Sequence, residues 1–175
     1  ACRYPSHGVT VAIVEVKEGN TCMITPPVLP GEPSRLAALR RYGATDHDTQ
    51  RTFNSLVELV ANICAAPMAV ISIVDESREW FHAKVGADVP ETPREFSFCA
   101  HAISEGGLFV VADTLLDRRF LDNPLVVGGP RIRAYACAPL VTPDGYKIGA
   151  LAAIDTKPRR LQPSQLAALG LLASQ

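Results

Sequence analysis

Two residue types that can do chemistry lie close together in the segment SFCAHAI, where Cys99 and His101 are separated by one alanine. On a strand the two side chains would point the same way, whereas on a helix they would diverge by about 200°. A metal would need further ligands, and the other three histidines are scattered, with no Asp or Glu at ligand spacing. We interpret the pair as an interior thiol beside a hydrogen-bonded histidine, with contact to a ligand as the alternative reading.

The cysteines give no framework for a disulfide fold or a zinc site, because their number is odd and none forms a C-x-x-C pair: Cys2, Cys22, Cys64, Cys99 and Cys137. We expect reduced thiols. A nucleophilic Cys99 would need a base and an oxyanion donor, and no local signature supplies either. The sequence also lacks the phosphate-loop, dinucleotide-binding, zinc-protease and serine-hydrolase motifs. These observations predict a domain that is not an enzyme.

For several other polar and aromatic residues, the sequence leaves two interpretations open. In one interpretation Asp75 bonds turn amides while Trp80 and Phe81 cover an edge of the sheet, and in the other Trp80 or Phe81 forms part of a pocket wall. The segment 113–123 is dense in Asp and Arg and is long enough to be a lid, or it is a capped loop in solvent. Arg131 and Arg133 could contact an anion or extend into solvent.

Composition narrows the class of protein. The chain has 175 residues, a net charge of -1 and 47% hydrophobic residues, which fits one globular domain and disfavours a partner with a phosphate backbone. The longest apolar run, residues 68–74, is far short of the roughly 18 residues that cross a membrane. The N-terminus does not resemble a secretory signal, so we expect a cytoplasmic location.

The pattern of elements predicts a short hairpin over residues 9–25 and a proline-rich linker over 26–33, which together form an N-terminal unit of residues 1–33. That unit is either an extra edge of the main sheet or part of an upstream module. The main domain is then residues 34–175, with helices at 35–43, 49–66, 96–104 and from Pro163 onward, and a turn of helix at 118–121. Strands are expected at 68–75, 79–86, 108–113, 133–141 and 146–155, and residues 86–95 read as a loop. Hairpin connections rather than crossovers predict an α+β fold: a central antiparallel β-sheet with helices on both faces.

The segments SFCAHAI, DRRFLDNPLV and APLVTPDGYKIGALAAID, in this order, resemble the GAF domain family, in the form found near the start of bacterial sensor histidine kinases and cyclic-dinucleotide enzymes. The resemblance covers residues 34–175. It implies a GAF/PAS-like, profilin-like fold, with the first and last helices packed together on one face and a small-molecule pocket on the other. Carried over by position, eight residues would lie on or near that pocket: Trp80, Phe98, Cys99, Ala102, Asp113, Phe120, Asn123 and Tyr135.

The resemblance implies a sensory module of a signal-transduction protein, such as a two-component histidine kinase, that couples an unidentified small molecule to its terminal helices and to a linked output domain. The spacing Cys99-Ala100-His101 differs from the adjacent Cys and His of bilin-binding members, and the Asn-Lys-Phe-Asp-Glu motif of cyclic-nucleotide binders is absent. Alternative functions are a thiol reductase of the free methionine sulfoxide type, using Cys99 with Cys64 or Cys137, and a dimerisation scaffold without a ligand.

Three structural expectations follow. Trp80, Phe98 and Tyr135 border one cavity. The stripe of Leu166, Leu169 and Leu172 is partly exposed and supports a homodimer through the terminal helices. Cys99 is structural or faces the ligand, and it is not catalytic.

Overall fold

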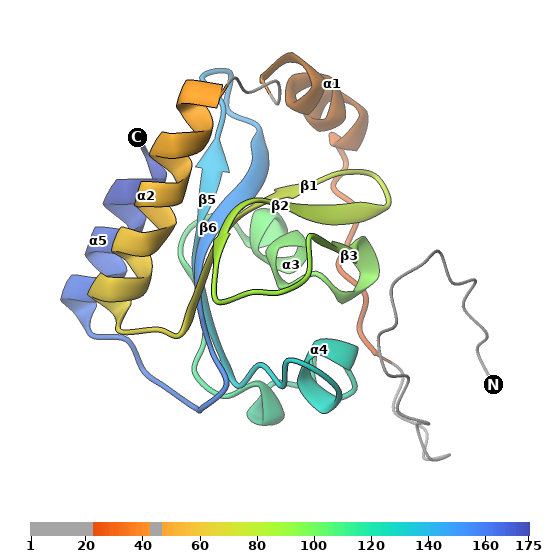
Figure 1. Ribbon diagram of the computed structural model, residues 1–175. Helices are drawn as coiled ribbons and strands as arrows, with labels where there is room; N and C mark the ends of the chain where they lie inside the picture. Colours follow the sequence, from red (N-terminus) through yellow and green to blue (C-terminus); the bar gives the residue numbers. More distant parts are fainter. Residues whose placement is uncertain (1–22, 43–46) are drawn as a thin grey trace.

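The computed structural model describes residues 23–42 and 47–175 (Figure 1). The hairpin expected over 9–25 lies almost entirely outside these residues. The described strands form one antiparallel sheet in the order β3-β2-β1-β6-β5-β4. Their bounds are β1 Met68–Val74, β2 Arg78–Val85, β3 Glu91–Pro93, β4 Phe109–Val111, β5 Ala134–Val141 and β6 Lys147–Asp155. Helices cover both faces, so the predicted α+β class is confirmed (Figure 1).

The centre of the sheet forms where the sequence is most apolar. Every residue of β1 is buried, because this strand lies between two others and under helices on both faces. The hairpin of β5 and β6 turns at Gly145, whose φ of +87° favours glycine, and the Gly145 amide donates to the Thr142 carbonyl at 2.8 Å. The predicted Pro-Asp-Gly turn is therefore present.

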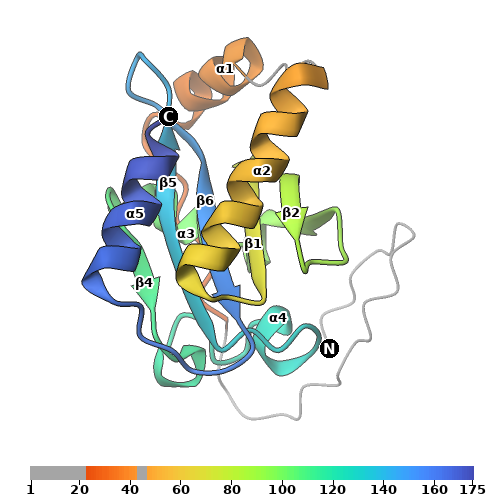
Figure 2. The same ribbon diagram turned by 60° about the vertical axis from the view of Figure 1, so that its left-hand side comes forward.

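One face of the sheet is covered by α2 (His47–Cys64) and α5 (Pro163–Ala173), which lie side by side (Figures 1 and 2). The amide of Gln165 joins them by donating to the Ile63 carbonyl at 2.8 Å. The stripe of α5 faces the sheet: Leu169 is buried, and Leu166 and Leu172 are half-buried against the same cluster. The expectation of a partly exposed stripe therefore holds for Leu166 and Leu172 and was wrong for Leu169, and the dimer stays a prediction.

The helix that pairs with α5 is α2, and α1 (Glu32–Tyr42) lies apart from it (Figure 2). The expectation that the first helix packs beside the last was therefore wrong for α1. The apolar side chains of α1, Leu36 and Leu39, pack on Ile73 of β1 instead. A cluster of buried ionic side chains at the start of α1, described below, fixes this position.

The other face carries α3 (Phe98–Glu105), which begins at the N-cap Ser97 and ends at Gly106 with a φ of +91°. Two short elements follow it, η2 (Thr114–Leu116) and α4 (Pro124–Val127). The single turn of helix expected at 118–121 was misplaced, because the capping side chains are those of Asp113 and Asn123, on either side of it. The expected loop before α3 contains β3 and η1 (Arg94–Phe96). Within the described residues, no helix is both long and apolar enough to cross a membrane.

Candidate functional site

Three predicted site residues form one aromatic stack between α3 and the sheet. The ring of Phe98 lies 4.1 Å from that of Phe120 and 4.9 Å from that of Tyr135, measured between centroids. Cys99 and Ala102 are fully buried in the same cluster. These five predicted residues therefore meet on the α3 face, and their side chains pack there as core.

Asp113 and Asn123 lie at the two ends of the segment expected to be a lid, and both fix its backbone. The carboxylate of Asp113 accepts from the Leu115 amide at 3.1 Å and also accepts two hydrogen bonds of 2.9 Å from Arg133. The side-chain amide of Asn123 donates to the Phe96 carbonyl at 2.9 Å, while its oxygen accepts from the Leu125 amide. Asn123 thus ties this segment to the residues immediately before α3. Arg133 is one of the two arginines that could contact an anion, and its guanidinium group is paired with Asp113.

Trp80 lies on the opposite face of the sheet, so the prediction of one cavity bordered by Trp80, Phe98 and Tyr135 was wrong. Trp80 is paired in register with Ile73 and packs in the cluster that contains Leu36 of α1. Side chains alternate along a strand, so it is the next residue, Phe81, that packs against the cluster beneath α3. Of the two aromatics considered for a pocket wall, Phe81 therefore lies on the α3 face and Trp80 does not.

Sequence reasoning missed the most unusual residue on the α3 face, Glu79. This residue is 4% exposed and lies on β2 two positions before Phe81, so both side chains point to the same side. Its carboxyl group accepts a hydrogen bond of 3.4 Å from Thr92, and the hydroxyls of Ser72 and Ser97 also hydrogen-bond it. The signal was a glutamate at an inward position of an alternating strand.

Burial dominates the electrostatics of Glu79 and raises the pKa of its carboxyl group, although the hydrogen bonds from the three hydroxyls act in the opposite direction. Among the described residues, no ion pair involves this carboxyl group. Ser97 has a second role, because its hydroxyl oxygen caps α3 by accepting from the Ala100 amide at 2.8 Å. The buried acid is thereby joined to the first turn of α3.

The cysteine thiols on the two faces of the sheet are not activated as nucleophiles. Burial, followed by the nearby Glu79 carboxyl and the Cys137 thiol, raises the pKa of Cys99 well above its usual value. Burial also raises the pKa of Cys137 and that of Cys64. Cys64 belongs to the apolar cluster under α2, on the other side of the sheet from Cys99. It therefore cannot serve as a resolving partner for Cys99 in this fold.

His101 diverges from Cys99 on α3, as the helical spacing predicts. It is 4% exposed, lies edge-on to Phe120 at 5.1 Å, and hydrogen-bonds the backbone of Ile24. Burial, together with the charge of Arg119, lowers the pKa of His101. The contact with Ile24 holds the N-terminal segment, residues 23–31, beside α3 on its way to α1 (Figure 1).

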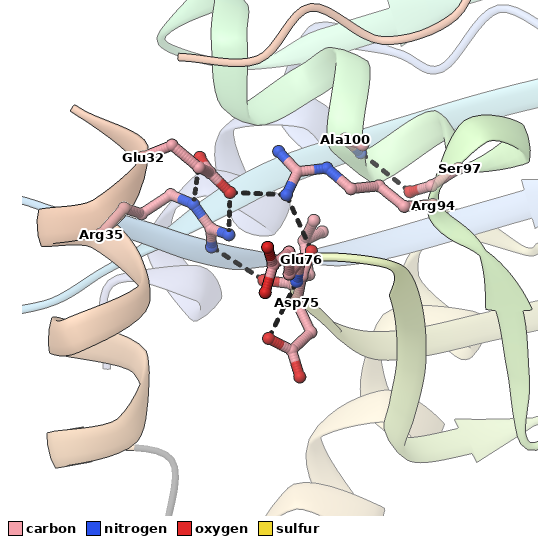
Figure 3. Close-up of polar contacts among 8 residues, drawn as sticks. Glu32, Arg35, Asp75, Glu76, Arg94, Ser97 and Ala100 are labelled. Carbon is pink, nitrogen blue, oxygen red and sulfur yellow. Dashed lines mark hydrogen bonds and ion pairs between the residues drawn. The ribbon is translucent and has the colours of Figure 1, made fainter. Parts of the chain in front are cut away.

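An ionic cluster connects α1 with the residues just before α3. Figure 3 shows the carboxylate of Glu32 between Arg35, which donates at 2.6 and 2.9 Å, and Arg94, which donates at 2.5 Å. Arg35 also donates to the Val74 carbonyl and Arg94 to the Asp75 carbonyl, each at 2.8 Å. The backbone at the end of β1 is thus bound from two directions. Asp75, expected to bond turn amides, accepts from the Glu76 amide at 2.8 Å.

Burial alone would raise the pKa of Glu32, but the hydrogen bonds and charges of Arg35 and Arg94 outweigh it and hold that pKa at about 2. The carboxylate is therefore ionised at neutral pH. In the part of the chain that the structure describes, no group of three or more His, Cys, Asp or Glu side chains could hold a metal ion.

Comparison with known proteins agrees with this architecture. A cyclic di-GMP phosphodiesterase of Pseudomonas aeruginosa is 45% identical over 137 residues, which cover 78% of this chain but only 23% of that protein. The GAF domain of an Acinetobacter phosphoenolpyruvate-protein phosphotransferase superposes with a TM-score of 0.61 at 13% identity, covering 84% of this chain and 90% of that one. The blue-light-absorbing PixJ GAF domain of Thermosynechococcus elongatus gives 0.58 at 20% identity, covering 75% and 86%. The family model described as GAF domain matches residues 48–175, well over half of the sequence, and the chain therefore belongs to the GAF domain family.

Proposed function

We propose that this GAF domain is a sensory module that binds a small molecule between α3 and the sheet. The observation that supports this most directly is the buried carboxyl group of Glu79, which has hydroxyl partners and no ion pair among the described residues. A core built only for stability does not need an acid there, because burying an acid without a counter-ion is unfavourable. The aromatic stack would supply apolar walls, and Glu79 with its hydroxyls would orient the ligand.

The binding event would open the α3 face. Phe98, Phe120 and Tyr135 are packed ring to ring, so a ligand has to displace at least one of them. The bound and unbound states would then differ in the position of α3. A ligand shifts such an equilibrium only through its different affinity for the two states.

The contacts around α3 connect it with the other helices. Ser97 contacts Glu79 and caps α3, and three residues earlier Arg94 holds Glu32 of α1. A movement of the first turn of α3 would therefore reach α1 directly and would reach α2 and α5 through the sheet. A coupling free energy of about 1 to 3 kcal/mol, typical of allosteric proteins, changes an affinity by about 5 to 150-fold.

The chain spans only 23% of the length of its phosphodiesterase relative, so we assign no phosphodiesterase chemistry to it. In the proposed role the domain regulates a covalently linked output domain, either a cyclic-dinucleotide enzyme or a histidine kinase of a two-component system. The buried, high-pKa thiols favour this role over a thiol reductase. The free thiols of the described residues fit a reducing compartment, which we propose to be the cytoplasm.

Native mass spectrometry of protein purified without added ligand tests the binding proposal. We expect one small molecule on the wild type and on Glu58→Gln, a control on the exposed side of α2, and a reduced amount on Glu79→Gln. Finding no bound molecule, together with no thermal shift from a metabolite library, would contradict ligand binding at this face and favour a scaffold.

A homodimer through α2 and α5 has separate support, because Leu59, Ile63 and Leu171 are 44%, 37% and 66% exposed on these helices. Sedimentation velocity of Leu59→Gln/Leu171→Gln should show dissociation relative to the wild type. Leu116→Gln, at a side chain 84% exposed on another part of the surface, serves as the control. A wild-type monomer at high concentration would exclude this interface.

A further inference from the structure

A surface depression of about 600 Å³ lies at the β4 edge of the sheet, separate from the buried Glu79 cluster. One wall is formed by β4 and η2, and the other by residues 158–160, which connect β6 to α5. Figure 2 shows this connection passing the segment that follows β4. We call the depression the β4 groove.

The two walls of the β4 groove are joined by Arg159. Its backbone amide donates to the Ala112 carbonyl at 2.9 Å, and its guanidinium pairs with Asp155 at 3.0 Å. The same guanidinium donates to the carbonyls of Cys64 and Ala65, at 2.7 and 2.5 Å. The groove is therefore held by hydrogen bonds from β4 to the end of α2.

The charges that remain available in the β4 groove are positive. Its two carboxylates already have partners outside the lining: Arg133 binds Asp113, and Arg119 binds Asp117 at 2.6 Å. Arg118 and Arg160 also line the groove, both are exposed, and neither makes a side-chain hydrogen bond or ion pair with the described residues. Two guanidinium groups, one on each wall, are thus open to a ligand.

Apolar side chains lie beside these two cations. Val110 is 43% exposed and Leu116 is 84% exposed, and Pro158 lies on the opposite wall. A leucine so exposed loses contact with water when an apolar group covers it, which is favourable. Guanidinium groups match the paired oxygens of carboxylates and phosphates.

From this combination we infer that the β4 groove binds a small organic anion, a phosphate ester or a carboxylate, whose apolar group packs on Val110 and Leu116. This site does not depend on the proposed pocket beneath α3. Its wall at 158–160 leads within a few residues to Pro163, the first residue of α5. An anion bound there contacts the segment that positions α5. The position of α5 would then respond to a second ligand.

Phenyl phosphate and benzoate are suitable probes, with benzyl alcohol as the neutral analogue. We expect amide NMR shifts at Val110, Leu116 and Arg160 with one or both anions at about 10 mM, and none with the alcohol. Comparing the two anions distinguishes a phosphate site from a carboxylate site. Arg118→Gln/Arg160→Gln should weaken binding by roughly tenfold or more.

The control is Arg40→Gln/Arg51→Gln, which removes two exposed arginines from α1 and α2 and should leave the titration unchanged. Absence of shifts with both anions would overturn the inference, as would equal binding by the Arg118 and Arg160 double variant. Glu79→Gln should bind the probes like the wild type, so failure of the α3 proposal and failure of this one are distinguishable.

Discussion

Arg94 donates a hydrogen bond of 2.5 Å to the carboxylate of Glu32, which lies 62 positions earlier in the chain. The same carboxylate accepts from Arg35, so one acid compensates two buried guanidinium groups. Replacing it in Glu32→Gln leaves both positive charges buried and should lower the free energy of unfolding by about 3 kcal/mol. Urea denaturation measures this loss.

The matched control for that change is Glu91→Gln. Its ion pair with Arg78 joins side chains that are 44% and 51% exposed, so its loss should cost less than about 1 kcal/mol. Equal effects of the two substitutions would show that the Glu32 cluster does not contribute as a buried group.

At acidic pH, the free energy of unfolding should depend on the protonation of Glu32. Its pKa in the folded protein, about 2, lies below the usual 4.5, so the unfolded chain takes up this proton first. The contribution of Glu32 is therefore complete above about pH 4.5 and is lost as the pH falls toward 2. Urea titrations across this range should show a smaller decrease for Glu32→Gln than for the wild type; parallel curves would refute the assignment.

Glu79 should have the opposite effect on how the free energy of unfolding depends on pH. Its folded pKa is raised, so the native protein holds a proton that the unfolded chain releases, and this stabilisation declines as the pH rises from about 4.5 through the folded pKa. Glu79→Gln, which resembles the neutral acid, should remove a slope of up to about 1.4 kcal/mol per pH unit. Comparing its unfolding with that of Glu58→Gln between pH 4 and 8 isolates this carboxyl group, and a slope unchanged in Glu79→Gln would argue against it.

Cys99 should be inert in the folded protein because its thiol is buried and its pKa is raised. Alkylation at pH 7 followed by peptide mapping should find Cys99 and Cys137 unmodified until urea is added. Cys99→Ser should fold and should leave any signalling output in place. Rapid alkylation of Cys99 in native protein would instead revive the reductase hypothesis.

The aromatic stack should be the most sensitive apolar site. Phe120 is fully buried and contacts both Phe98 and His101. Phe120→Ala should therefore cost about 3 to 5 kcal/mol in unfolding free energy. Leu116→Ala, at an exposed side chain, should change it by less than about 0.5 kcal/mol. A loss near 1 kcal/mol for Phe120→Ala would mean that this face is loosely packed.

The long elements could be predicted because their signals are local. The run MAVISIV indicates a buried strand, and the Pro-Asp-Gly turn defines the hairpin of β5 and β6. Five of the predicted site residues also meet beneath α3, because the resemblance to a known family placed them by position. Two elements of three residues, β3 and η2, were missed because so few residues carry no periodicity to detect, whereas β4 lies within the apolar run expected to be a strand at 108–113.

The remaining errors concern which way side chains point. Trp80 and Phe81 are neighbours in one strand, and their faces depend on the register with β1, where an irregularity falls between Ile71 and Ser72. Glu79 went unnoticed because a glutamate in a sequence is read as exposed. Its burial is decided by residues from three other segments, Ser72, Thr92 and Ser97. No single segment of the sequence indicates such a long-range arrangement.

The two edges of the described sheet, β3 and β4, are each only three residues long. An edge strand exposes unpaired backbone groups that can template the addition of a strand from another molecule, and very short edges limit this route to aggregation. The central strands β1 and β6 each lie between two strands, whereas β4 covers only residues 135–137 of β5 and β3 only residues 78–80 of β2. Backbone pairing with another molecule is thereby confined to the outer strands of the described sheet, and its centre offers only side-chain surfaces, where single substitutions can tune association.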